Sequence, residues 1–161
     1  SSLSNKRLSD PIISEGGPFL FDQKLFLYQM ESFEIQFTFI APASTVFENY
    51  LDSEKHSMMT GGEAEISPNQ GEGFTAWDGY IEGVNIEIVS GEYIKQEWRT
   101  SEFSSTDEDS VLELIFRSDE KGNCLLTLKH SNIPDGQGEN YKKGWYDHYF
   151  HPMEAFYNSN G

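Results

Sequence analysis

The sequence predicts an α+β fold in which one curved antiparallel sheet of about six to seven strands wraps around a long C-terminal helix. Short segments with strand-like alternation follow one another through the middle of the chain, separated by turn residues. Residues 138–158 place large apolar side chains at steps of four, four, four and three, which is typical of one buried helix face. A single sheet needs a cover for its concave face, and this segment is the only one long enough to supply it.

The chain of 161 residues has the size of one domain with a full hydrophobic core. We expect residues 1–29 to form an N-terminal extension and residues 30–161 to form the folded domain. The polar residues 1–17 predict a flexible lead, whereas residues 19–28 are apolar enough to pack on the domain or to pair with a sheet edge. The first thirty residues lack the pattern of a signal peptide, and no apolar stretch is long enough to span a membrane. A cytoplasmic protein is therefore expected.

The predicted elements follow in a simple order. Residues 31–40 alternate apolar and polar side chains and predict a half-buried strand. A short helix opens at Pro42, and a second covers residues 52–59 and stops at Gly61 and Gly62. Pro152 falls inside the long C-terminal helix and should kink it or mark its last turns. The remaining strands are predicted at residues 64–67, 73–77, 80–89, 93–102, 110–118 and 124–130.

The charge balance limits the possible partners. The chain carries 11 basic and 27 acidic residues, for a net charge of -16. A nucleic-acid binder needs a basic surface to displace phosphate counterions, and no such surface is visible in the sequence. Anionic membrane surfaces are disfavoured for the same reason. Solubility is the simplest interpretation of the acidity, and a basic protein partner or a cation is the sharper one. We expect a monomer or a weak homodimer.

Residues with reactive side chains give only weak patterns. Cys124 is the single cysteine, so no intrachain disulfide forms, and its apolar neighbours predict a small core residue. His148 and His151 lie three apart on the predicted helix, near Asp147 and Glu154. Two histidines without a third ligand are more often solvent-facing than metal-binding, so neither a metal nor another cofactor is predicted. The many carboxylates single out no acid–base pair, and no catalytic residue is predicted.

The aromatic residues allow two interpretations, a filled core or a pocket. Trp98 is expected to point into the interior, with Glu97 and Arg99 solvated on the opposite face. In the pocket interpretation, His56 and Met59 lie near the entrance. The full set of candidate cavity residues is His56, Met59, Phe74, Trp77, Trp98, Leu114, Phe116, Leu128, His130, Tyr141, Trp145 and Tyr149.

Several short motifs occur in a distinctive order. They are APASTVF at 41–47, GF at 73–74, DGYIEG at 78–83, IKQEWR at 94–99, LTLKH at 126–130 followed by IP at 133–134, and GW at 144–145. Through them the chain resembles, over about residues 30–157, the activator of heat shock protein 90 ATPase homologue family. That family is a branch of the START-like, birch-pollen-allergen-like superfamily. The resemblance implies a helix-grip fold with a cavity that in related families holds lipids, hormones or other apolar molecules.

Three functions are consistent with this resemblance. The first is a non-enzymatic module that binds an apolar or aromatic small molecule between sheet and helix. The second is a stress-related, co-chaperone-like module that acts on a chaperone or another protein partner. The eukaryotic co-chaperone of this family contacts the chaperone through a further N-terminal domain, for which residues 1–29 are too short. The third is a hydrolase or cyclase that uses the cavity.

Overall fold

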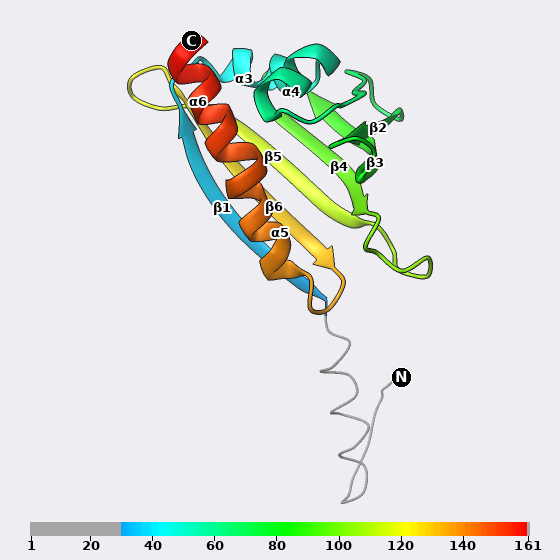
Figure 1. Cartoon of the computed structure of the whole chain (residues 1–161). Helices are drawn as coiled ribbons and strands as arrows, with labels where there is room; N and C mark the ends of the chain where they lie inside the picture. The colour runs from blue at the N-terminus through cyan, green and yellow to red at the C-terminus, as the bar shows by residue number, and fades with distance from the viewer. Residues whose placement is uncertain (1–29, 161) are drawn as a thin grey trace, which may run out of the picture. The chain divides into compact units, whose positions relative to one another are not determined.

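The computed structural model describes residues 30–160 (Figure 1). The predicted N-terminal extension, with its apolar stretch at residues 19–28, lies outside the described residues. The α+β class and the helix-grip arrangement predicted from the sequence are confirmed. One curved antiparallel sheet lies against a long helical segment at the C-terminal end, and two short helices follow the first strand.

The sheet has six strands in the order β1-β6-β5-β4-β3-β2, so the first strand of the domain pairs with the last. In β1, Phe37 lies opposite Leu126 of β6, and all neighbouring pairs run antiparallel. The strands are β1 (Glu31–Phe39), β2 (Gly73–Ala76), β3 (Ile81–Val89), β4 (Tyr93–Thr100), β5 (Ser110–Ser118) and β6 (Cys124–Ile133).

The strand predicted at residues 64–67 is reduced to a single bridge between Glu65 and Thr75. Helix α4 (Ser53–Thr60) lies beside this segment, and two of its serines bind the backbone amides on either side of Glu65. The hydroxyl of Ser57 accepts from the Ala64 amide at 2.9 Å, and that of Ser53 accepts from the Ile66 amide at 2.8 Å. These two amides point away from β2, so α4 occupies the side of the segment where a second neighbouring strand would pair.

The long C-terminal segment is not a continuous α-helix. It consists of α5 (Gly138–Trp145), a π-helical turn at Tyr146–Phe150 and α6 (His151–Asn160). The amide of His151 donates to the carbonyl of Tyr146, five residues earlier. The predicted disturbance at Pro152 is thus absorbed by a wider turn just before it, since proline has no amide to continue the α-helical pattern.

The wider turn changes which side chains face the sheet. Both Tyr149 and Phe150 are buried in it. At the end of α6 the buried position belongs to Tyr157, whereas Phe156, which the spacing predicts on that face, is only half-buried. The extra residue shifts the apolar stripe by one position relative to a regular helix.

The core lies between the concave face of the sheet and this helical segment. The inward side chains of β5 are those predicted by parity, and Leu112 and Leu114 are almost fully buried. In β6, Leu128 and His130 are buried on the same face. Helix α3 (Ala43–Tyr50) and α4 lie near the end of the sheet where α6 terminates (Figure 1). The opposite end of the interior, next to α5, is where the side chains leave a cavity.

Candidate ligand-binding site

An aromatic cavity of about 220 Å³ lies between the sheet and the junction of α5 with the π-helical turn. Six of its eight lining residues are aromatic, and they include all three tryptophans of the chain. We call this cavity the chamber. Its lining residues are Trp77, Tyr80, Trp98, Tyr141, Gly144, Trp145, His148 and Tyr149.

Trp77 is presented to the chamber by a tight turn after β2. Its φ of 53° and the φ of 60° at Asp78 lie in the left-handed region, which is rare for a bulky side chain. Such a conformation costs about 1–3 kcal/mol unless neighbouring contacts hold it. The carboxylate and amide of Asp78 form two hydrogen bonds with the backbone of Glu63, at 3.0 and 2.9 Å. These bonds fix the turn and with it the position of the indole.

The indole of Trp77 lies directly over Gly62. A Cβ atom at Gly62 would be 2.4 Å from the ring, so only glycine leaves space for the indole. The ring also makes an edge-to-face contact with His148, with centroids 5.3 Å apart. The Nε1 atom of Trp77 is buried and has no hydrogen-bond acceptor among residues 30–160. Trp77 thus joins the α4–β2 connection to the π-helical turn.

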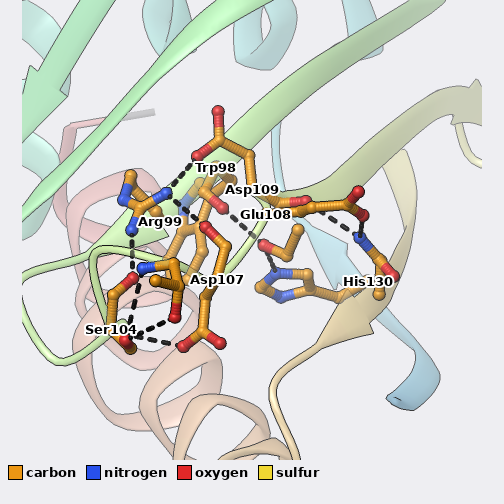
Figure 2. Close-up of polar contacts among 10 residues, drawn as sticks. Trp98, Arg99, Ser104, Asp107, Glu108, Asp109 and His130 are labelled. Carbon is orange, nitrogen blue, oxygen red and sulfur yellow. Dashed lines mark hydrogen bonds and ion pairs between the residues drawn. The ribbon is translucent and has the colours of Figure 1, made fainter.

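Behind the chamber, a hydrogen-bond chain holds Trp98 and Trp145. Nε1 of Trp145 donates to Nδ1 of His130 at 3.2 Å, and because indole is only a donor, Nδ1 is the unprotonated nitrogen. Nε2 of His130 therefore donates to the Ser110 hydroxyl at 2.9 Å, which donates to the carbonyl of Trp98 at 2.6 Å. Figure 2 shows His130 and Trp98 at the two ends of these two hydrogen bonds.

The environment of His130 suits a structural role. Its side chain is fully buried, and burial lowers its pKa to about 3. The ring of Trp98 packs edge-on against the imidazole at 4.6 Å between centroids. A neutral imidazole with both nitrogens engaged positions the two tryptophans and has no free nitrogen for proton transfer.

A second buried histidine supports the chamber from the side of α4. Nδ1 of His56 donates to the carbonyl of Tyr50 at 2.8 Å, and Nε2 accepts from the hydroxyl of Tyr149 at 2.9 Å. Burial lowers the pKa of His56 to about 4 and raises the pKa of both tyrosine hydroxyls. The tautomer of His56 is therefore the reverse of that of His130, and its bond orients Tyr149 in the chamber wall.

The rim of the chamber carries tyrosine hydroxyls. That of Tyr141 donates to the side chain of Gln137 at 2.6 Å, so the 2.6 Å contact with Thr100 has the threonine as donor. The hydroxyl of Tyr80 donates to the carboxylate of Glu102. Burial is the main cause that raises the pKa of both Tyr80 and Tyr141. Both tyrosine hydroxyls of the rim are therefore uncharged at neutral pH.

The chamber brings together five of the residues predicted from the sequence, Trp77, Trp98, Tyr141, Trp145 and Tyr149. The predicted His56 and His130 lie behind its wall. The other predicted residues pack elsewhere. Phe74 lies over Gly83, Met59 accepts a hydrogen bond from Tyr157, Phe116 packs against Phe47, and Leu114 and Leu128 are core residues at most 1% exposed.

Three lining residues were missed, Tyr80, Gly144 and His148. Gly144 carried a usable signal, because a glycine inside a helix costs about 1 kcal/mol relative to alanine and is rarely placed there without reason. His148 follows Gly144 by four residues and so shares its helix face. Tyr80 gave no signal, since its position depends on the turn that precedes it.

The remaining reactive residues do not form a site. His151 lies 3.9 Å from the carboxylate of Glu154, apart from His148. Within residues 30–160, no group of three or more histidine, cysteine, aspartate or glutamate side chains is placed to hold a metal ion. Cys124 is fully buried, and burial raises its pKa to about 12, which disfavours the reactive thiolate.

Arg99 differs from the expectation that it would be solvated. It folds back over the loop between β4 and β5 (Figure 2) and donates to the carboxylate of Asp109 at 2.7 Å. It also donates to the carbonyls of Asp107 at 3.1 Å and Ser104 at 2.9 Å, and its guanidinium lies over the ring of Phe103. The fork of donors on arginine explains why this outward residue is held by the loop. Glu97 is exposed as expected.

Comparisons with known proteins agree on the fold. The family model described as activator of Hsp90 ATPase homolog 1-like protein matches residues 40–157. An HSP90 activator from Plasmodium falciparum is 27% identical, with a TM-score of 0.71 over 78% of this chain and 94% of that one. A protein from Mesorhizobium loti is 12% identical, with a TM-score of 0.68 over 81% and 99%. A protein from Chromobacterium violaceum is 20% identical, with a TM-score of 0.62 over 78% and 96%.

None of the curated proteins matches the chain. Within the part of the chain that the structure describes, no helix is both long and apolar enough to cross a membrane.

Proposed function

The chain belongs to the family of activator of Hsp90 ATPase homolog 1-like proteins, and from this premise we propose that it binds a small apolar or aromatic molecule without transforming it. The observation that carries the proposal is the chamber, in which all three tryptophans and three tyrosines surround about 220 Å³ of space. Ligand sites in proteins are concave, mostly apolar and equipped with a few polar groups, and the chamber with its hydroxyl rim has this composition.

The volume of the chamber limits the ligand. An engineered protein cavity of about 150 Å³ binds benzene, so about 220 Å³ suits a molecule of one or two rings. A sterol or a long fatty acid would not fit inside without rearrangement of the wall. The expected ligand is therefore a small aromatic compound.

The titratable groups around the chamber favour binding over catalysis. Among residues 30–160, its lining includes neither a carboxylate nor a cysteine, and His148 is its one imidazole. His56 and His130 use both ring nitrogens in hydrogen bonds, and burial lowers both pKa values. A general base needs a free nitrogen or carboxylate within reach of the substrate, and these histidines do not offer one.

Titration of the ¹⁵N-labelled full chain with indole tests this proposal. The three indole Nε1–H signals of the protein all report on the chamber wall, and we expect all of them to shift as indole binds. Trp77→Leu should weaken binding about fivefold, since an aromatic pair contributes about 0.5–1.5 kcal/mol beyond its buried area. Tyr146→Leu is the control, because Tyr146 is also a half-buried aromatic residue and lies on the helical segment beside the chamber without lining it. Saturable binding that shifts none of the three signals would contradict the proposal.

A second candidate function is a co-chaperone-like interaction with Hsp90. It is favoured by the likeness to the Plasmodium falciparum HSP90 activator. The two proteins are 27% identical, and the match covers 94% of the activator's chain. The net charge of -16 would make such an interaction sensitive to salt. A pull-down with the full-length chaperone and with its middle domain, at low and moderate salt, tests this candidate. Binding that is lost as salt rises supports it, and no retention at low salt counts against it.

A further inference from the structure

A second hollow of about 290 Å³ adjoins the chamber on its outer side. Four residues border both spaces, namely Tyr80, Tyr141, Gly144 and His148. The wall that is not shared is polar and consists of Asn140, Lys143 and Asp147. We call this second hollow the vestibule. An aromatic space and a polar space therefore meet along the helix face that carries Gly144.

Gly144 lies between the chamber and the vestibule and, unlike any other residue, has no side chain to fill the space between them. It lies inside α5, where glycine destabilises a helix more than any other residue except proline. No close packing requires it, since the nearest atom to a Cβ placed there would be Cδ2 of His148 at 3.9 Å. This contrasts with Gly62, where the indole of Trp77 excludes any side chain. Gly144 thus borders both spaces without placing a side chain between them.

The charges in the vestibule indicate which polar group would fit. Lys143 and Asp147 form an ion pair with each other, so neither is free to bind an opposite charge without losing a partner. The net charge of -16 opposes the approach of an anion. A cation would compete with Lys143 for Asp147. An uncharged group that donates and accepts hydrogen bonds, such as a hydroxyl or an amide, suits both members of the pair.

We propose that Gly144 is the portal between the two spaces, and that the ligand is a one- or two-ring aromatic molecule with an uncharged polar substituent. The ring lies in the chamber, and the substituent passes over Gly144 into the vestibule. This inference rests on the proposed function, because it assumes that the chamber holds a ligand. It adds a polar subsite, an orientation of the ligand and a specificity-determining residue.

A pair of probes of equal size tests the polar subsite. Ethylbenzene and benzyl alcohol differ only by a terminal methyl or hydroxyl group, and both fit the chamber. If its hydroxyl were buried without a hydrogen-bond partner, benzyl alcohol would bind roughly 5- to 150-fold more weakly than ethylbenzene. We expect benzyl alcohol to bind within about fivefold of ethylbenzene, or more tightly, because its hydroxyl reaches the vestibule. Dissociation constants are measured by calorimetry on the full chain.

Two variants test the portal. The added methyl of Gly144→Ala fits, so this variant should unfold at a higher temperature and still bind both probes. The leucine side chain of Gly144→Leu would fill the space between the chamber and the vestibule. This variant should therefore lose at least about fivefold more affinity for benzyl alcohol than for ethylbenzene. In the native chain, nuclear Overhauser contacts between the methylene protons of bound benzyl alcohol and the Hα atoms of Gly144 are expected. They provide the decisive readout if the leucine variant does not fold.

The outcomes separate this inference from the proposed function. If neither probe binds and indole does not bind, the proposed function fails and this inference fails with it. If ethylbenzene binds and benzyl alcohol is more than about fivefold weaker, the chamber stands and the polar subsite is overturned. If Gly144→Leu affects both probes equally, or if no contacts reach Gly144, the portal is overturned.

Discussion

The indole of Trp145 donates a hydrogen bond to Nδ1 of His130 over 3.2 Å, which joins the C-terminal helical segment to the last strand in the middle of the core. Because indole cannot accept, this single bond determines the protonation of both imidazole nitrogens. The bond from Nε2 to Ser110 and the bond from Ser110 to the carbonyl of Trp98 follow from it. The orientation of two chamber tryptophans thus depends on polar side chains behind them.

Ser110→Ala is expected to destabilise the protein by about 1–3 kcal/mol. Ser110 is fully buried, so its removal leaves the Nε2–H of His130 without an acceptor, and an unsatisfied buried donor carries this cost. The free energy of unfolding in urea measures the change. Ser105→Ala, at an exposed position in the loop before β5, should change stability by less than about 0.5 kcal/mol. Equal stability of both variants would show that the hydrogen-bond chain contributes little.

The buried histidines predict a loss of stability as the pH falls below about 6.5. Burial lowers the pKa of His56 to about 4 and of His130 to about 3, whereas both titrate near 6.5 in the unfolded chain. Between these values the unfolded state binds more protons, so the free energy of unfolding decreases with falling pH. Each histidine should contribute a slope of about 1 kcal/mol per pH unit between pH 4.5 and 5.5. Their contribution is fully present above pH 6.5.

Single variants isolate these slopes from the titration of the rest of the chain. His56→Gln and His130→Gln should each reduce the pH dependence of stability by about 1 kcal/mol per pH unit, whatever their effect at neutral pH. Glu31, whose pKa is lowered chiefly by hydrogen bonds from the amides of Gly136 and Gly138, also adds pH dependence near pH 4.5, but it is present in the wild type and in both variants and cancels in the comparison. Urea unfolding at pH 4.5, 5.5 and 7.5 provides the data. Unchanged slopes in both variants would refute the assignment.

Arg99→Met should destabilise the protein by about 1–2 kcal/mol and loosen the loop between β4 and β5. It removes charge-assisted hydrogen bonds to Asp109, Asp107 and Ser104. Their contribution to stability is lowered by solvent screening, because the site is partly exposed. Arg99→Lys should recover only part of the loss, since a single ammonium cannot replace the fork. Hydrogen exchange of the loop amides measures the effect. Arg117→Met, at an exposed position of β5, is the control.

The alternation of apolar residues was sufficient to predict the sheet and its inward faces. Leu112 and Leu114 on β5 and Leu128 on β6 lie where their parity places them, because a pleated strand turns successive side chains to opposite faces. The helix stripe was predicted correctly as far as Met153, which is almost fully buried. Four aromatic chamber residues, Trp98, Tyr141, Trp145 and Tyr149, followed from these two periodicities, since both faces point into the same interior. Trp77 is presented by the turn after β2 instead.

Features that depend on contacts between distant segments were not predictable in this way. Only the bridge at Glu65 forms where a strand was predicted, and the serines of α4 bind the amides on either side of it. The π-helical turn moves Tyr157 into the core at the expense of Phe156. Tyr80 reaches the chamber only through the left-handed turn at Trp77. None of these has a periodic signature, because each is decided by a partner elsewhere in the chain.

Gly62→Ala should both destabilise the protein and impair the chamber. The new Cβ atom would lie 2.4 Å from the indole of Trp77, so the ring has to move away from Gly62, and its contact with His148 is disturbed. Overpacking of this kind costs about 1–3 kcal/mol, and the displaced ring should weaken indole binding about fivefold. Urea unfolding, the Trp77 indole signal and an indole titration measure the three effects. Gly73→Ala is the matched control, because a Cβ there meets nothing closer than 3.4 Å. Wild-type stability and indole affinity in Gly62→Ala would mean that Trp77 is not held by this contact.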